Sequence, residues 1–252
     1  MNILFDLLAR AAVKRRFNAS WFKMLAMQSV DDAKIMAARK GLEFVEAGMV
    51  VGLGSGSTAT HFIRLLGEQV QAGLKVRGIA SSRASEELAV SLGIPVIDFR
   101  DATEIDVAID GADEVGPALA LIKGGGGALL REKIVASASK QFVIVADGSK
   151  VVQRLGKFPL PVEVIQLAEP LVSRRLEDLG LRPALRQQKD GSPYVTDEGN
   201  FILDCATGEM DDPAKVAAEI RAIVGVVEHG LFLHMATRAL ISDGSGVREL
   251  LR

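Results

Sequence analysis

Cysteine and histidine are both scarce in this chain of 252 residues. The single cysteine, Cys205, excludes a disulfide within the chain and is typical of a protein from a reducing compartment. The 3 histidines, His61, His229 and His234, are scattered along the sequence and predict no metal site. We expect the cysteine and the histidines to have structural roles or to lie on the surface.

An excess of charge of one sign and long apolar runs are missing as well. The chain has 30 Lys and Arg residues against 32 Asp and Glu residues, and this balance excludes nucleic-acid binding by overall charge. An anionic ligand would therefore need a local cluster of donors. No run approaches the about 20 apolar residues that a membrane-spanning helix needs, so we predict no membrane partner. Hydrophobic residues make up 48% of the chain, enough for one large domain with or without a small one.

Residues 1–30 read as an N-terminal extension. They are rich in Leu and Phe, and the part before position 20 is basic, with Asp6 as its one acid. This pattern is typical of an organelle-targeting peptide. A secretory signal fits poorly because the basic cluster follows the apolar stretch, and a start at Met24 or Met27 is a further alternative. We expect an extension without a catalytic role, in a cytoplasmic protein unless the extension directs it to an organelle.

The next part of the chain alternates between short apolar strands and amphipathic helices. The expected strands are residues 49–54, 76–80, 95–99, 106–110 and 141–147. The expected helices are residues 31–45, 57–71, 85–92 and 128–140. This alternation predicts a parallel sheet that is covered by helices on both faces.

The pattern changes after Lys157, where PLPVEVI alternates between apolar and polar residues. Two further helices, residues 168–180 and 211–224, flank a hairpin and strand in TDEGNFILDC. This β-α-β-β-α order predicts a small α+β domain. A last strand is expected at residues 239–241. The predicted parts are an extension (1–30), a catalytic domain (31–156 plus 228–252) and a small domain (157–227).

Polar clusters follow the predicted strands of the large domain. The clusters GSGST, SSR, DGADE and DGSK come directly after the first, second, fourth and fifth strands. In parallel sheets the ligand site lies off the carboxyl ends of the strands, where these clusters would meet. The sequence therefore predicts one site built from all of them.

The segment GLGSGSTA predicts an anion site. Its glycines follow a strand, and Ser57 and Thr58 would stand at a helix N-terminus, where amides and the helix dipole favour negative charge. A tight turn with a hydroxyl cap is the alternative. A dinucleotide site is disfavoured, because the G-x-G-x-G spacing misses the fingerprint and the second strand ends in SSR without an acid. We favour a small phosphate ester as the ligand. Arg83 either contacts its phosphate or lies on the protein surface.

Four glycines, residues 124–127, follow Lys123 and precede the predicted helix that contains Glu132. Glycines let the backbone approach a ligand, and consecutive N–H groups can form an anion-binding concavity. A flexible linker is the alternative.

The carboxylates of this region favour proton-transfer chemistry. Asp110 ends the fourth predicted strand and Asp113 follows it, and together with Lys123 and Glu132 they would bracket the site. In an aldose–ketose interconversion, one carboxylate moves a proton between adjacent carbons while a cation stabilises the oxyanion. Glu114 is less well placed, and we expect it to be solvated.

The blocks GLGSGSTA, DGADE, KGGGGALLREKI, ADGSK and LGKFPLPVEVI, in this order, resemble ribose-5-phosphate isomerases of the A type. The resemblance extends from about Asp31 to the C-terminus. It implies interconversion of D-ribose 5-phosphate and D-ribulose 5-phosphate through an enediol(ate), in the non-oxidative pentose phosphate pathway, with no metal and no cofactor. It also implies a Rossmann-like domain with a smaller ferredoxin-like domain, and a homodimer or homotetramer.

The resemblance also implies roles for single residues. Glu132 would be the general base, with Asp110 and Lys123 as further catalytic groups. Lys150 would reach the phosphate, and Lys34 is a second lysine that can do so. The implied substrate-binding residues are Ser55, Gly56, Ser57, Thr58, Asp110, Gly111, Ala112, Asp113, Lys123, Gly124, Gly125, Gly126 and Lys150. Two alternatives are a sugar-phosphate sensor without turnover and an isomerase or deaminase that acts on a hexose phosphate.

Overall fold

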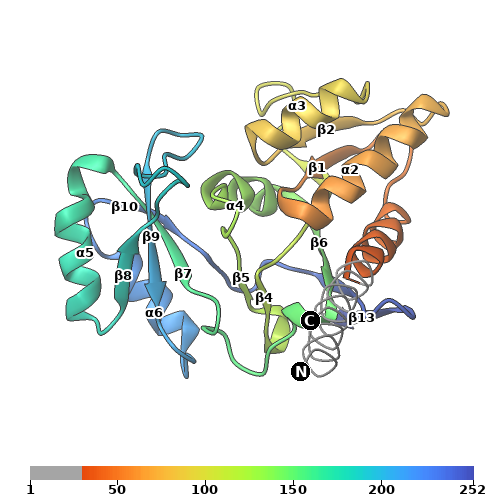
Figure 1. Cartoon of the computed structure of the whole chain (residues 1–252). Coiled ribbons are helices and arrows are strands. Elements are labelled where there is room, and N and C mark those ends of the chain that lie inside the picture. Colours follow the sequence, from red (N-terminus) through yellow and green to blue (C-terminus); the bar gives the residue numbers. More distant parts are fainter. Residues whose placement is uncertain (1–29) are drawn as a thin grey trace, which may run out of the picture.

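The computed structural model describes residues 30–252. The extension predicted for residues 1–30 therefore lies outside the described residues, apart from Val30, as do the alternative starts at Met24 and Met27. Figure 1 shows a large lobe built around one sheet and a smaller lobe built around another. Among residues 30–252, every helix is too short or too polar to cross a bilayer.

The large lobe is built on a six-stranded sheet in the order β13-β12-β6-β3-β1-β2. All neighbouring strands pair in parallel except β12 and β13, which are antiparallel. The strands are β1 (Val50–Leu53), β2 (Arg77–Ala80), β3 (Ile105–Asp110), β6 (Ser139–Asp147), β12 (Arg238–Ser242) and β13 (Val247–Leu251). Strand β1 and the central residues of β3 (107–109) and β6 (142–146) are apolar because both faces of the sheet are covered there.

Helices cover this sheet on two faces, and β6 supplies side chains to both. Phe142 and Ile144 pack into one apolar cluster with α4, whereas Val143 and Val145 pack into the other with α2 and α3, as the alternation of side chains along a strand requires. The helices are residues 30–42, α2 (Gly56–Gln71), α3 (Arg83–Ser91) and α4 (Leu129–Ser137). Each lies close to its expected place, so the α/β class is confirmed.

The strand order creates a crevice between β1 and β3. Residues 95–99, which follow α3, lie beside β2, through one bridge between Val96 and Gly78, and the chain then crosses to β3 on the other side of β1. This is the doubly wound order, in which ligands bind off the carboxyl ends of the strands where the chain changes direction. The sequence clusters after β1 and β3 meet at that point.

The smaller lobe has an antiparallel four-stranded sheet in the order β10-β7-β9-β8. With its two helices it follows the β-α-β-β-α-β sequence of a ferredoxin-like unit, which confirms the predicted α+β fold. Its elements are β7 (Leu160–Val164), α5 (Glu169–Asp178), β8 (Arg182–Leu185), β9 (Phe201–Ala206), α6 (Pro213–Arg221) and β10 (Val226–His229), with the short helix η3 (Gln166–Ala168) before α5. The division at residues 157 and 227 stays a prediction.

A third, three-stranded sheet lies beside these two and was not expected. Its strands are β4 (Glu114–Val115), β5 (Leu121–Ile122) and β11 (Leu231–Phe232), with the short helix η1 (Pro117–Leu119) between β4 and β5. Strand pairs this short carry little pattern in the sequence. Hydrogen bonds of this sheet fix the backbone of Asp113 and Lys123, because Asp113 N donates to Ile122 O (2.8 Å) and Lys123 N donates to Gly230 O (2.9 Å).

Three secondary-structure predictions were wrong in part. Residues 95–99 form a single bridge instead of a strand, because Pro95 has no N–H to donate and the chain turns at Asp98. The helix predicted to reach residue 140 ends at Ser137, since Ser139 pairs with Ile105 of β3. The strand at residues 239–241 is not the last, because β13 pairs with it.

Glu114 is buried, and the expectation that it is solvated was wrong. Only 3% of the residue is exposed. Its carboxylate accepts hydrogen bonds from the backbone N–H groups of Gly156 (2.7 Å) and Phe158 (2.5 Å). The carboxylate thus holds the segment that enters β7 against β4.

We expect Glu114→Gln to lower the free energy of unfolding by roughly 1.5–3 kcal/mol, because a charged acceptor of two buried N–H groups is replaced by a neutral amide. Urea unfolding followed by circular dichroism measures the change. Glu209→Gln, at an exposed glutamate, is the control and should change it by less than about 0.5 kcal/mol. Equal effects of the two substitutions would show that the Glu114 contacts do not stabilise the fold.

Candidate active site

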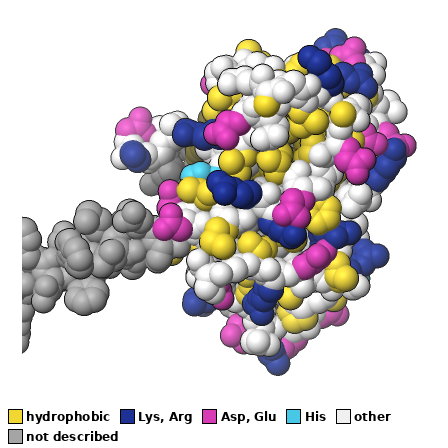
Figure 2. Space-filling model, turned by 90° about the vertical axis from the view of Figure 1, so that its right-hand side faces the viewer, with side chains coloured by type: hydrophobic (Ala, Val, Ile, Leu, Met, Phe, Trp, Pro, Cys, Tyr) yellow, Lys and Arg dark blue, Asp and Glu magenta, His cyan; other side chains and the backbone are white. Residues whose placement is uncertain are grey.

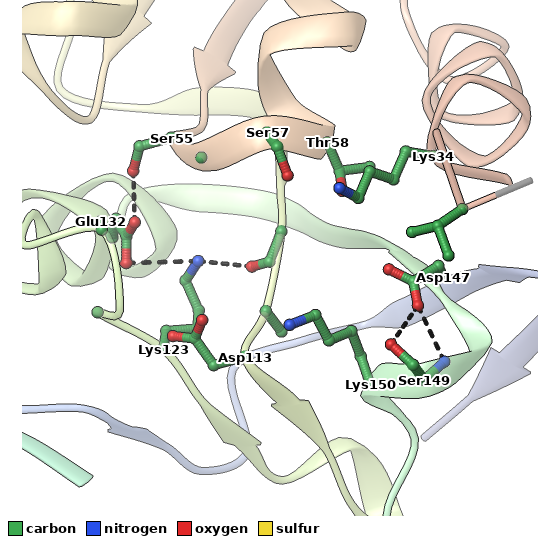
Figure 3. A pocket seen from close by; sticks show the side chains of 16 residues that line it. Lys34, Ser55, Ser57, Thr58, Asp113, Lys123, Glu132, Asp147, Ser149 and Lys150 are labelled. Atoms are coloured by element: carbon green, nitrogen blue, oxygen red, sulfur yellow. Dashed lines mark hydrogen bonds and ion pairs between the residues drawn. The ribbon is translucent and has the colours of Figure 1, made fainter. Parts of the chain in front are cut away.

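A cavity of about 250 Å³ opens at the carboxyl ends of β1 and β3. Figure 3 shows its side chains converging from the first helix, α2, α4 and the loops after β3, β5 and β6. It is lined by Val30, Lys34, Ser55, Gly56, Ser57, Thr58, Gly111, Ala112, Asp113, Lys123, Gly124, Gly126, Glu132, Asp147, Ser149 and Lys150. The cavity therefore joins every cluster that the sequence predicts for the site except SSR.

The loop between β1 and α2 forms one wall. A Cβ atom at Gly54 would lie 2.4 Å from Asp110 Oδ1, so only glycine lets this loop pass so close to the carboxylate. Ser55 N donates to the same oxygen of Asp110 (2.9 Å). Ser55 is also the N-cap of α2 and makes no side-chain capping bond, so the first turn of α2, with Ser57 and Thr58, stands open to the cavity.

A buried ammonium group lies at one end of the cavity between two carboxylates. Lys123 Nζ is 3.0 Å from Asp110 Oδ2 and 3.4 Å from Glu132 Oε2, and it donates to Gly111 O (2.6 Å). Ser55 Oγ donates to the other oxygen of Glu132 (Figure 3). All three charged residues are at most 4% exposed. Their charges are therefore only weakly screened by solvent.

Burial and charge shift the protonation of this cluster. Burial raises the pKa of Asp110 to about 7, although the charge of Lys123 opposes the shift and that of Glu132 adds to it. Burial also disfavours the charged form of Lys123, but Asp110 and Glu132 outweigh it and raise the pKa of the ammonium group. The two carboxylates therefore favour the charged form of Lys123. Burial raises the pKa of Asp113 as well.

Residues 124–127, called the glycine loop below, form the floor of this end. Gly125 N donates to Asp113 Oδ2 (2.7 Å), and Gly127 N donates to Gly124 O (3.0 Å). The N–H groups of Gly124 and Gly126 have no hydrogen-bond partner within residues 30–252, and both residues line the cavity. Unpartnered amides beside an ammonium group suit an oxyanion.

The opposite end of the cavity carries two further lysines. Lys34, from the helix at residues 30–42, and Lys150, from the short helix η2 (Gly148–Lys150), lie far from Glu132 in Figure 3. Asp147 lies beside them, and it accepts hydrogen bonds from the N–H group (2.9 Å) and the hydroxyl of Ser149. With the open first turn of α2, this end offers cations and amides to an anion.

Most of the predicted site residues line the cavity, but two do not. Asp110 lies behind it and contacts Lys123 and Ser55, while Gly125 is exposed with its amide on Asp113. Asp147 and Ser149 line the cavity without having been predicted, although the DGSK cluster contains both. Val30 lines it too, and no sequence signal marks it. The roles of all these residues stay predictions.

Arg83 does not contact the cavity. Its backbone N–H and its guanidinium group both donate to Asp197 of the loop before β9 (2.8 Å each), so it joins the two lobes. Cys205 and His229 are buried, and His61 lies 3.3 Å from Asp31. The part of the chain that the structure describes has no cluster of three or more His, Cys, Asp or Glu residues arranged to bind a metal.

Charges on one face of the large lobe are mixed in sign. Figure 2 shows the side of the molecule away from the four-stranded sheet, where basic and acidic side chains are interspersed among hydrophobic ones. This face therefore has no excess of positive charge that would attract an anion.

Comparison with known sequences gives one family. Residues 77–246 match the family model for ribose 5-phosphate isomerase A (phosphoriboisomerase A). Ribose-5-phosphate isomerase A of Parvibaculum lavamentivorans is 46% identical over 224 residues, which cover 86% of this chain and 97% of the relative. The protein of the same name from a Roseiflexus species is 51% identical over 217 residues, which cover 85% of this chain and 93% of that one.

Comparison with solved structures agrees. The structure of ribose 5-phosphate isomerase A from Methanocaldococcus jannaschii has a TM-score of 0.84 and 41% identity, and the match covers 88% of this chain and 99% of that one. A structure of D-ribose-5-phosphate isomerase in complex with phospho-erythronic acid has a TM-score of 0.86 and 39% identity over the same shares of the two chains.

The raised pKa of Asp110 predicts a pH dependence of stability. A carboxyl group whose pKa is higher in the folded protein binds more protons when folded, so its contribution to the free energy of unfolding falls as the pH rises from 3.8 to about 7. Asp110→Asn removes this fall. We therefore expect urea unfolding at several pH values to show that the variant gains stability relative to the wild type over this window. Parallel profiles of the two proteins would contradict it.

Proposed function

Since the chain belongs to the ribose 5-phosphate isomerase A family, we propose that its cavity holds a pentose 5-phosphate with the phosphate beside Lys34 and Lys150 and the reacting carbons beside Glu132. The protein is an aldose–ketose isomerase of the pentose phosphate pathway that interconverts D-ribose 5-phosphate and D-ribulose 5-phosphate. This assignment excludes the alternative of a sugar-phosphate sensor without turnover.

The main observation that supports this proposal is the environment of Glu132. Its Oε1 atom accepts the hydroxyl of Ser55, whereas its buried Oε2 atom forms no hydrogen bond within residues 30–252 and has only the ion pair with Lys123, at 3.4 Å. A buried acceptor without a hydrogen bond costs stability, and a catalytic role is one explanation for its presence in a folded protein. We propose that this oxygen takes the proton from one reacting carbon of the open-chain sugar and returns it to the neighbouring carbon.

Lys123 and the glycine loop would hold the intermediate. When the proton leaves C2 of the aldose, negative charge moves onto O1 of the enediolate. The ammonium of Lys123 and the amides of Gly124 and Gly126 lie at this end of the cavity and would stabilise that charge. A proton moves from O2 to O1 as the proton on Glu132 is delivered to C1, and the ketose results.

The two aspartates would have different parts. Asp113 lines the cavity and would accept hydrogen bonds from sugar hydroxyls. In its protonated form, which burial favours, it would donate a proton to the ring oxygen during ring opening. Asp110 lies behind the cavity, and its contacts to Lys123 and Ser55 favour an indirect part, in which it holds the ammonium group and the loop after β1 in place.

We further propose a homodimer or homotetramer in the cytoplasm. Apolar side chains are exposed on one end of the smaller lobe, including Leu167 (93% exposed) and Val224 (87% exposed), and exposed apolar patches are typical of subunit interfaces. Sedimentation would measure the oligomeric state. The single cysteine supports a reducing compartment.

We expect Glu132→Gln to lower kcat by about 10²–10⁴-fold, because the amide cannot accept the proton. KM should change little, since the contacts at the phosphate end remain. A coupled assay of ribose 5-phosphate conversion measures both. Glu177→Gln, at an exposed glutamate on α5, is the matched control and should keep the wild-type rate. Full activity of Glu132→Gln would remove the proposed base.

Lys150→Met tests the phosphate end. The loss of one charged contact of roughly 1.5–3 kcal/mol should raise KM about 10–100-fold. The value of kcat should change much less, because the contact is equally present in the ground state and the transition state. Lys189→Met, at an exposed lysine, serves as control. A fall in kcat at constant KM would instead place Lys150 near the reacting carbons.

A further inference from the structure

Arg186, the residue after β8, reaches from the smaller lobe to the glycine loop. Its Nη1 atom donates to Gly124 O (3.0 Å) and to Gly125 O (3.2 Å). Arg186 does not line the cavity, and none of the sequence motifs includes it. One guanidinium group thus holds two consecutive carbonyl groups of the loop that carries the proposed oxyanion donors.

The guanidinium group is itself firmly held. Asp204 of β9 accepts from Nε (2.8 Å) and Nη2 (2.5 Å), a two-point pair that restrains both the position and the plane of the group. The ring of Tyr194 lies 5.9 Å from Cζ on one side. The backbone of Arg186 is anchored as well, because its N–H donates to Ile202 O (2.9 Å) and its carbonyl accepts from Tyr194 N (2.9 Å).

The geometry of the peptide bond carries the effect of Arg186 to the cavity. In a trans peptide the carbonyl of one residue and the N–H of the next point in opposite directions, and the described chain has no cis peptide bond. When Arg186 binds Gly125 O, it therefore directs the N–H of Gly126 away from Arg186. Gly126 lines the cavity and its N–H has no partner in the described chain.

The preceding peptide is held in the same way at both ends. Its carbonyl, Gly124 O, accepts from Arg186, and its N–H, on Gly125, donates to Asp113. Glycines have no side chain to restrain such peptides, so in this loop a peptide can turn over at low cost unless its carbonyl is held. The loop would lose its donor geometry if Gly125 O were free.

We propose that Arg186 is a positioning residue for catalysis: held by Asp204, it orients the Gly125–Gly126 peptide so that the Gly126 amide donates to the oxyanion of the intermediate. This proposal rests on the proposed function. It gives the smaller lobe a direct part in the chemistry of the larger one. The effect acts on the transition state, because negative charge develops on O1 while the proton leaves carbon and is absent from the bound substrate.

Arg186→Met keeps the bulk of the stem and removes the donors. We expect kcat to fall by about 10²-fold, the scale seen when a catalytic group is misplaced by about 1 Å. KM for ribose 5-phosphate should stay within about threefold, because the phosphate end is untouched. The affinity for phospho-erythronic acid, a probe with a carboxylate at the reacting end, should fall with kcat, whereas inhibition by inorganic phosphate should not change.

A merely structural role would not produce this split. Arg154→Met is the control: Arg154 forms an exposed pair with Asp211 (2.8 Å) and does not touch the loop, so its rate should stay that of the wild type. Added methylguanidinium, supplied at millimolar concentration to Arg186→Ala, should restore part of kcat. Asp204→Asn, which loosens the guanidinium group without removing it, should lower kcat less, in the same direction.

Clear outcomes overturn the proposal. A folded Arg186→Met protein with wild-type kcat would do so, as would a loss confined to KM with unchanged affinity for phospho-erythronic acid. If circular dichroism shows that Arg186→Met does not fold, Arg186→Lys and Asp204→Asn decide, and wild-type kcat in both would refute the proposal. Failure of the proposed function looks different, because the wild-type protein itself would then not convert ribose 5-phosphate.

Discussion

The contact on which the site depends is the buried ammonium of Lys123 between Asp110 and Glu132. An isolated charge in this place would be strongly disfavoured, and each member is tolerable because the others are present. The cluster also joins three different elements: Asp110 ends β3, Lys123 follows β5 and Glu132 lies in the first turn of α4. Folding must bring all three together before the cavity exists.

The rest of the molecule can be understood as support for that cluster. The doubly wound sheet places the ends of β1 and β3 side by side, and Gly54 lets them approach. The smaller lobe holds the glycine loop through Arg186, and the contact between Arg83 and Asp197 also joins the two lobes. Helix α4, which carries Glu132, packs against strands of both lobes, so both sheets fix the position of this helix. Precision at the reacting end is thus a property of the whole chain.

Sequence reasoning predicted the strong patterns and missed the weak ones. The helices and the buried strands of the large sheet carry long periodic signals, and the glycine and acid clusters mark the strand ends, so most of the cavity lining could be listed in advance. The strands β4, β5 and β11 are two residues long and have no pattern to detect. Glu114 and Arg186 look like surface charges in sequence, because their partners are backbone groups 42 and 62 positions away. The position of Asp110 behind the cavity could not be predicted either, because it depends on how the strands and loops pack in the folded chain.

The cavity bears ammonium groups at both ends, with Lys123 at one and the pair Lys34 and Lys150 at the other, across a space of about 250 Å³. With the phosphate bound beside Lys34 and Lys150 and the reacting carbons beside Glu132, as proposed above, the length of the cavity would select the substrate. A sugar phosphate whose carbonyl group falls short of Glu132 or lies beyond it would bind without reacting. Selection by length would need no contact with the middle of the sugar, so recognition of the stereochemistry there would need other groups, and Asp113 is one that lines the cavity.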